Sequence, residues 1–281
     1  MSAEGRGAYG FRLDGVAGAQ DLLVPSPPAW PPLDLVRADG AAGAPDIDRI
    51  GPDRAVLPLQ SGGWVDLDRA AGRATFHLDP QPPDGDLVHP YLAPGAAVAA
   101  RWAGREAFHA GAIAIGGAAY GLLGDKEAGK STTLGWLALH GHDVLVDDLV
   151  VLDGGDVLAG PRCVDLRAEA AELLGAGEPL GIVGLRERFR LRLGSCAAAV
   201  PLRGWIVLEW AGDRDGETTL EPVLGSERLL ALLPHRAVRL EPPAPADLVE
   251  LSSRPVWRLR RPRRPDALPA VTELLAALPH P

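Results

Sequence analysis

The chain is almost free of lysine, because only Lys126 and Lys130 are lysines among its 28 Lys and Arg residues. Cysteine is also scarce: Cys163 and Cys196 are too few for a disulfide framework, so a reducing cytoplasm is the default compartment. The first ten residues lack the basic start and apolar run of a signal peptide, and we expect none. A net charge of −9 argues against general binding to nucleic acid.

Long apolar runs are missing as well. The uncharged stretch 107–124 approaches the length of a membrane span, but it contains His109 and five glycines, so two strands fit it better than a helix. The apolar share of 47% is enough for a core, and 281 residues suit one domain with a subdomain or two small ones. We predict a β-rich N-terminal subdomain over residues 1–95, a catalytic core over residues 96–281, and no membrane partner.

Both lysines lie in one nine-residue motif that fits the phosphate-binding pattern G-x-x-x-x-G-K-[ST], and Lys130 occupies the lysine position of that pattern. The alternative is a chance match, since the chain has 34 glycines. The motif consists of Gly124, Asp125, Lys126, Glu127, Ala128, Gly129, Lys130, Ser131 and Thr132.

The surroundings of the motif are those of a strand, a loop and a helix. Two apolar runs, Ala110–Ile115 and Ala118–Leu123, flank Gly116-Gly117 and predict a hairpin that leads into the loop. Ser131–His140 is helix-like and ends before Gly141. This context favours a phosphate-binding loop over a chance match.

The motif has a direct chemical interpretation. Small residues let backbone N–H groups close around phosphate oxygens, and a helix N-terminus adds partial positive charge. Lys130 supplies a compact charge for the β- and γ-phosphates, and the Ser131 hydroxyl is a hard oxygen ligand for Mg²⁺. The expected cofactors are therefore ATP and Mg²⁺.

A second constellation follows in Asp143–Leu152, which has a buried-strand pattern with Asp147 and Asp148 in its middle. In a strand these carboxylates would point to opposite faces of the sheet, and burying either one without a partner costs free energy. The functional interpretation is that one carboxylate binds Mg²⁺ and the other takes a proton from an attacking hydroxyl. The alternative is a β-turn at this pair, joining two short strands.

Phe108-His109-Ala110, the loop and Val146-Asp147-Asp148 together resemble the HPr kinase/phosphorylase family. The likeness is closest to the smaller kinases found with peptide natural products, such as lasso-peptide precursor kinases. It covers residues 89–260 in outline, and its specific part is 108–167. The resemblance implies an α/β fold with a P-loop core related to phosphoenolpyruvate carboxykinase.

The resemblance also implies residue roles. Asp147 would be the general base with His109 beside it, and Asp148 would bind Mg²⁺ together with Ser131. The stretch Gly160–Arg167 resembles the family segment that supplies a further acidic metal contact, here Asp165; the alternative is a surface acid that caps a helix over Ala168–Leu174. Residues from the arginine-rich strand Arg186–Arg192 could meet the transferred phosphate, with Arg188 and Arg190 as candidates.

The chain departs from the family pattern inside the loop. Bifunctional members place Ser-Gly where this chain has Lys126-Glu127, and a carboxylate at Glu127 near a triphosphate must point outward or pair with Lys126. We therefore expect neither the reverse phosphorolysis nor HPr itself as a substrate.

The N-terminal and C-terminal parts of the chain differ from its middle in composition. Pro25–Pro32 predicts a rigid connector, and short strands are expected at Ala55–Leu59, Trp64–Leu67 and Ala74–Leu78. Thr272–Leu278 predicts a closing helix. Six arginines surround Trp257 and form either a solvated basic face or a dock for an acidic peptide or for phosphates: Arg254, Arg258, Arg260, Arg261, Arg263 and Arg264.

These observations predict an ATP- and Mg²⁺-dependent kinase that phosphorylates a hydroxyl, with serine of a peptide or protein as the favoured acceptor. A small-molecule kinase on the same core and a nucleotide-binding regulatory module without transfer are the alternatives. The Asp147-Asp148 pair favours an enzyme, because a sensor needs no base. The expected partners are a nucleotide and a peptide or protein, and the oligomeric state, a homo-oligomer included, stays open.

Overall fold

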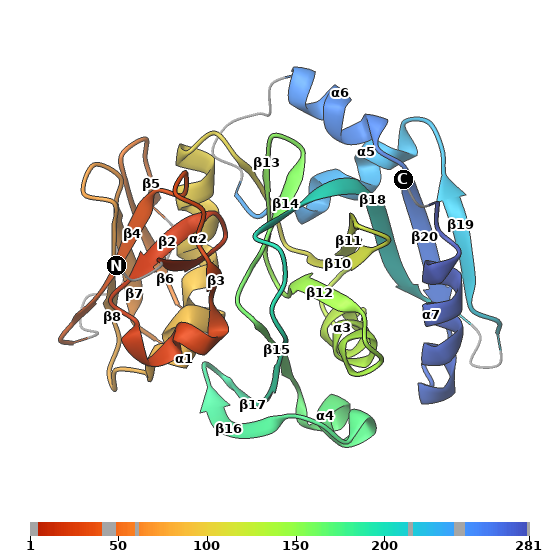
Figure 1. The fold of residues 1–281 in the computed structure, drawn as a ribbon, viewed down its shortest axis with the longest axis horizontal. Coiled ribbons are helices and arrows are strands. Elements are labelled where there is room, and N and C mark those ends of the chain that lie inside the picture. Colours follow the sequence, from red (N-terminus) through yellow and green to blue (C-terminus); the bar gives the residue numbers. More distant parts are fainter. Residues whose placement is uncertain (1–4, 41–48, 60–61, 213–215, 239–244, 280–281) are drawn as a thin grey trace.

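The protein is a mixed α/β structure with three sheets in the computed structural model, which describes residues 5–40, 49–59, 62–212, 216–238 and 245–279 (Figure 1). No helix among the described residues is long and apolar enough to cross a membrane.

The first sheet is built by the N-terminal part of the chain. Its strand order is β3-β1-β2-β4-β8-β7-β6-β5. Alternate residues point inward, as Ala55 and Leu57 do on one strand and Val65 and Leu67 on another. The strands are β1 (Arg6–Ala8), β2 (Phe11–Asp14), β3 (Val24–Pro25), β4 (Pro32–Ala38), β5 (Arg49–Ile50), β6 (Arg54–Pro58), β7 (Trp64–Asp68) and β8 (Arg73–His77).

The three expected N-terminal strands are confirmed as β6, β7 and β8, within a residue or two at their ends. The proline-rich segment is a connector, as predicted, because a turn over residues 26–31 joins β3 to β4 and buries Trp30. The 3-10 helix η1 (Ala17–Leu22) joins β2 to β3.

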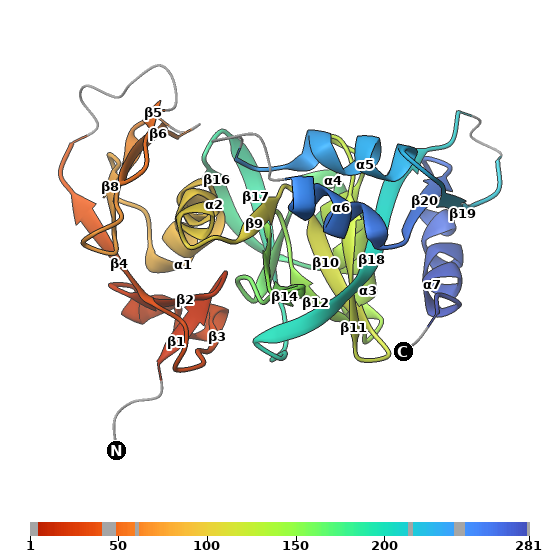
Figure 2. The same cartoon turned by 90° about the horizontal axis from the view of Figure 1, so that it is seen from above.

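The helix α2 (Leu92–Trp102) lies between the first sheet and the second (Figure 2). It contacts β6 and β7 on one side and β9 on the other. The boundary predicted near residue 95 falls inside this helix, so α2 joins the two regions. Before it come the short helices α1 (Asp84–Asp86) and η2 (Leu87–Tyr91).

The second sheet has the order β12-β10-β11-β18-β14-β13-β9, with β20 beside β18 and β19 beside β20. The predicted hairpin is present as antiparallel β10 and β11, and β18 runs parallel to β11 and to β20. The strands are β9 (Glu106–Phe108), β10 (Gly111–Ile115), β11 (Ala118–Leu123), β12 (Asp143–Val146), β13 (Val150–Asp153), β14 (Asp156–Leu158), β18 (Ala199–Trp210), β19 (Thr219–Val223) and β20 (Val256–Arg261).

This second sheet is covered on both faces, which explains why β11 is an unbroken run of buried residues. Tyr120 and Leu122 join an apolar cluster with α3 (Lys130–Leu139) and α7 (Leu268–Ala276). Ala119 and Leu123 face the other way, into a core shared with α5 (Glu227–Leu232), α6 (Pro245–Ser253) and the first sheet. The predicted closing helix exists as α7, but it begins at Leu268 and not at Thr272.

A small third sheet, in the order β15-β17-β16, lies below the other two in Figure 1. It consists of β15 (Cys163–Leu166), β16 (Glu178–Val183) and β17 (Arg186–Arg192). The helix α4 (Ala168–Leu174) follows β15 with the bounds expected from the sequence.

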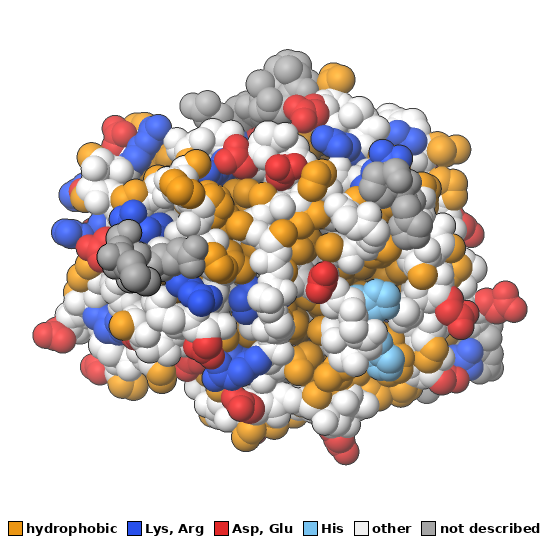
Figure 3. All heavy atoms as spheres, viewed as in Figure 1, with side chains coloured by type: hydrophobic (Ala, Val, Ile, Leu, Met, Phe, Trp, Pro, Cys, Tyr) orange, Lys and Arg blue, Asp and Glu red, His pale blue; other side chains and the backbone are white. Residues whose placement is uncertain are grey.

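The surface seen in Figure 3 carries acidic and basic side chains mixed with apolar ones. Among the side chains coloured there, no basic patch extends over the whole face.

Candidate functional site

The phosphate-binding motif forms the turn between β11 and α3, so strand, loop and helix occur in the predicted order. The helix begins at Lys130, one residue earlier than expected, and ends at Leu139. Gly129 precedes it with φ 87°, a left-handed conformation that glycine adopts without steric cost. The first turn of α3 therefore follows the last glycine of the loop directly.

Lys130 and Ser131 both line the cleft at this helix start. The Lys130 Nζ donates hydrogen bonds to the carbonyl oxygens of Gly124 at 2.6 Å and Asp125 at 3.4 Å. Burial lowers the pKa of Lys130, while Asp147 and Asp148 act in the opposite direction. The amine is thus held over its own loop, close to the two acids.

The continuous strand expected over Asp143–Leu152 is wrong. β12 ends at Val146 and β13 begins at Val150, with a bend at Asp147 and Asp148 between them. β12 pairs with β10, whereas β13 pairs with β9 and β14. The turn alternative describes the backbone better, and Asp148 has φ 74°, a conformation that Asp tolerates better than most residues.

The bend gives the two carboxylates different surroundings. Asp147 is 4% exposed and accepts hydrogen bonds from the Ser131 hydroxyl at 3.3 Å and from the Asp148 backbone N–H at 2.9 Å. The side chain of Asp148 is 39% exposed. Burial, reinforced by the neighbouring charge of Asp148, raises the pKa of Asp147 to about 7.

His109 lies beside Asp148, with 3.3 Å between its Nδ1 and Asp148 Oδ1. The backbone N–H of His109 donates to the carbonyl oxygen of His235, and Ala110 donates to that of Asp148. These bonds hold the end of β9 against the bend, so His109, Asp147 and Asp148 form one group of residues.

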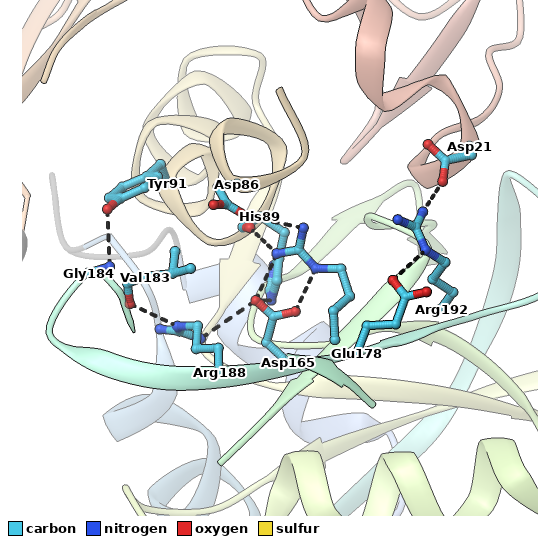
Figure 4. Close-up of polar contacts among 11 residues, drawn as sticks. Asp21, Asp86, His89, Tyr91, Asp165, Glu178, Val183, Gly184, Arg188 and Arg192 are labelled. Carbon is cyan, nitrogen blue, oxygen red and sulfur yellow. Dashed lines mark hydrogen bonds and ion pairs between the residues drawn. The ribbon is translucent and has the colours of Figure 1, made fainter. Parts of the chain in front are cut away.

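Asp165 is neither a surface acid nor a helix cap. The N-cap of α4 is Arg167, which makes no capping hydrogen bond with its side chain, and the side chain of Asp165 is fully buried in β15. Both Asp165 oxygens accept hydrogen bonds from Arg190, at 2.8 Å from Nε and 2.9 Å from Nη2 (Figure 4). The carboxylate is therefore occupied by a bidentate ion pair.

The same guanidinium reaches the N-terminal region, since Arg190 also donates to Asp86 at 3.3 Å and to the His89 carbonyl oxygen at 2.6 Å (Figure 4). His89, Cys163 and Asp165 lie close enough to hold a metal ion. Arg190 already supplies a cation to Asp165, so this group does not fit a metal. Burial lowers the pKa of His89.

The structure separates the two predicted phosphate arginines. Arg188 lines the cleft, with Nη1 3.9 Å from Asp165 and Nε bonded to the Val183 carbonyl oxygen. Arg190 is buried in the ion pair and is not among the cleft residues. Arg188 therefore remains the candidate for contact with the transferred phosphate.

Glu127, the acid inside the loop, lines the cleft, but its charge is paired. It pairs with Arg167 at 3.1 Å and not with Lys126. The hydrogen bond from Arg167 lowers the pKa of Glu127. The electrostatic conflict expected from the sequence is resolved by this pair.

Most of these residues line one cleft of about 1020 Å³. It extends to Ile50, Leu57 and Pro58 of the first sheet and to Ala93 and Pro94 of α2. The predicted site residues that line it are Asp125, Lys126, Glu127, Gly129, Lys130, Ser131, Thr132, His109, Asp147, Asp148, Asp165 and Arg188; Gly124, Ala128 and Arg190 do not.

Trp210 and Arg236 are among the lining residues that the sequence did not single out. Trp210, at the end of β18, donates from Nε1 to the Glu127 carbonyl oxygen at 3.0 Å. Arg236 lines the cleft and pairs with Glu106 at 3.0 Å. Neither lies in a motif, and their positions depend on strands that are distant in the sequence.

Neither a family model nor a curated protein matches the chain. Among solved structures, the chain is similar to the HPr(Ser) kinase/phosphatase from Coxiella burnetii, with a TM-score of 0.31 and 12% identity over 60% of this chain and 94% of that one. The structural relation to that protein is distant.

We expect Lys130→Ala to lose most of the thermal stabilisation that Mg·ATP gives the wild type, since a ligand that binds only the folded state raises its apparent stability. Thermal-shift titration measures this. Lys126→Ala removes the same charge from an exposed position of the loop and should keep most of the shift. An undiminished shift in Lys130→Ala would contradict the assignment.

Asp147 also predicts a pH-dependent stability. Its pKa is raised from 3.8 to about 7 in the folded protein, so its contribution is fully present below pH 3.8 and is lost as the pH rises through 7. Asn cannot ionise, so Asp147→Asn should gain free energy of unfolding relative to wild type by roughly 1.4 kcal/mol per pH unit in this window. Urea denaturation at pH 5 and pH 8, with EDTA present, should show the difference growing; a constant difference would show that Asp147 is not the titrating group.

Proposed function

We propose that the protein is an ATP- and Mg²⁺-dependent kinase that transfers the γ-phosphate to a hydroxyl. The observation that supports this most directly is the group formed by Lys130, Ser131, Asp147 and the Asp148–His109 pair in one cleft. A nucleotide sensor would need the loop but would gain nothing from a buried acid beside it.

Oxygen donors at the helix start and at the bend fit a magnesium ion. The Ser131 hydroxyl and the carboxylate of Asp148 are hard ligands of the kind Mg²⁺ takes, and Lys130 is the loop cation that interacts with Asp147 and Asp148. When bound, Mg²⁺ neutralises charge on the phosphates. Asp165, paired with Arg190, is not needed for this set.

The other groups would act on phosphate and acceptor. Backbone N–H groups of the loop and the Lys130 ammonium bind phosphate oxygens. Asp147 accepts the proton of the acceptor hydroxyl, because a general base works best with a pKa near the working pH, and its pKa is about 7. His109 orients Asp148, and Arg188 offers a guanidinium toward the cleft.

We expect Asp147→Asn to bind Mg·ATP and lose phosphoryl transfer, and Asp148→Asn to transfer with a raised Mg²⁺ requirement. The reason is the difference in burial, which makes Asp147 a poised base and leaves Asp148 hydrated. Transfer rates measured across a Mg²⁺ titration separate the two roles. The reverse pattern would mean that the contact between Ser131 and Asp147 marks the metal side and that Asp148 with His109 is the base.

We further propose that the acceptor is serine in a peptide. The cleft continues from Asp147 to an apolar wall of Ile50, Leu57 and Pro58, which gives a peptide a surface that phosphate chemistry alone does not require. The hairpin of β16 and β17 borders the same cleft through Arg186, Glu187 and Arg188. An open groove of this kind suits an extended segment better than a small metabolite.

We expect a panel of serine-bearing peptides to gain one phosphate from ATP, whereas free amino acids and sugars gain none, as read by mass spectrometry. Ile50→Ser should reduce peptide labelling and leave the Mg·ATP thermal shift unchanged, because Ile50 lies on the distant wall. Labelling of a free small molecule with no peptide labelled would instead support a small-molecule kinase.

A further inference from the structure

The arginines near the end of β20 do not form one basic face. Arg258 and Arg260 pair with Glu209 at 2.9 and 3.2 Å, and Arg264 pairs with Asp266 at 3.3 Å. These three fit the solvated interpretation. Arg261 differs, because it is 4% exposed and has no carboxylate partner among the described residues.

Arg261 lies against the phosphate-binding loop. A Cβ atom added to Gly129 would be 2.4 Å from Arg261 Nη2, and the same nitrogen is 3.4 Å from the Thr133 hydroxyl of α3. The guanidinium carbon is 4.2 Å from the centre of the Trp210 ring, and Trp210 is itself bonded to the loop at Glu127. Arg261 Nε is buried and makes no hydrogen bond among the described residues.

The electrostatics of this position favour an anion. The N-terminus of a helix carries partial positive charge, so a cation beside it is unfavourable without a counter-charge. Lys130 lies at the same helix start, and the Arg263 guanidinium is 5.1 Å from the same indole ring. Burial and the charge of Arg263 lower the pKa of Arg261 to about 10. The face of Trp210 compensates only part of this cost.

Three other arginines of the cleft pair with acids. Arg167 pairs with Glu127, Arg236 with Glu106, and Arg264 with Asp266. Against that background, a buried guanidinium with an unused N–H is a binding group. We propose that Arg261, together with Arg263, binds the phosphate chain of the nucleotide, so that the end of β20 completes the anion site formed by the loop and Lys130.

This inference rests on the proposed nucleotide binding and names a residue that the motif does not contain. A phosphate chain fits this position better than an acidic peptide does. Arg261 is buried against Gly129 at the base of the phosphate-binding loop, where the acidic side chain of a peptide would have to displace the phosphates of the nucleotide. The planar fork of arginine also matches phosphate oxygens.

Calorimetric titration of the full chain with inorganic tripolyphosphate, Mg·ATP and adenosine tests the inference without any transfer step. We expect Arg261→Met to weaken tripolyphosphate and Mg·ATP by roughly 10- to 100-fold and adenosine by little. Arg261→Lys keeps the charge without the fork and should fall in between, which also serves if Arg261→Met fails to fold. Arg258→Met is the matched control on β20, since Glu209 keeps Arg260 as a partner, and it should bind like wild type.

The outcomes separate the inference from the function on which it rests. Wild-type binding with no loss in either Arg261 variant overturns the inference and leaves the kinase proposal standing. Failure of the wild type to bind tripolyphosphate or Mg·ATP overturns both. Equal weakening for adenosine and tripolyphosphate would show a structural role only, and Arg261-dependent binding of an acidic peptide without tripolyphosphate binding would assign the site to the acceptor.

Discussion

The cleft depends on one buried ion pair, Asp165 with Arg190. Its two hydrogen bonds join β15 to β17, and the further contacts of Arg190 with Asp86 and His89 attach this small sheet to the segment that leads into α2. Two buried charges are costly to desolvate, and bidentate geometry together with the extra acceptors offsets that cost. Because α2 also carries the first sheet, this pair helps to set the distance between the two walls of the cleft.

Positive and negative side chains occupy different parts of the cleft. Positive groups gather where the loop meets α3, with Lys130 from the helix and Arg261 from β20. The acids lie at the bend between β12 and β13, where Asp147 is held nearly without water. Burial together with a neighbouring like charge raises the pKa of Asp147 to about 7 and lowers the pKa of Arg261 to about 10.

The scaffold that holds these groups is the second sheet. Alternate residues of β18 enter different cores, with Trp205 and Val207 on one face and Ile206 and Leu208 on the other. The loop, the bend and the end of β20 are therefore attached to a sheet packed on both sides. Such a support restricts the movement of the site residues more than a surface loop would.

Local sequence determined the elements whose signals are local. The order of strand, loop and helix around Lys130 follows from two apolar runs and a glycine at each end of the loop, and the bounds of α4 follow from its short-range helix signals. The hairpin of β10 and β11 was readable for the same reason, because a glycine pair between apolar runs specifies a turn.

Only the tertiary structure decided what each charged side chain meets. The bend at Asp147 arises because β12 and β13 pair with different strands, which the continuous apolar pattern cannot reveal. Arg190 and Arg261 each look like one arginine in a basic run, yet one is buried by α1 and η2 and the other by α3 and Trp210. Burial, ion pairing and the resulting pKa shifts depend on contacts between segments far apart in the chain, so the sequence alone could propose these residues but could not assign their partners.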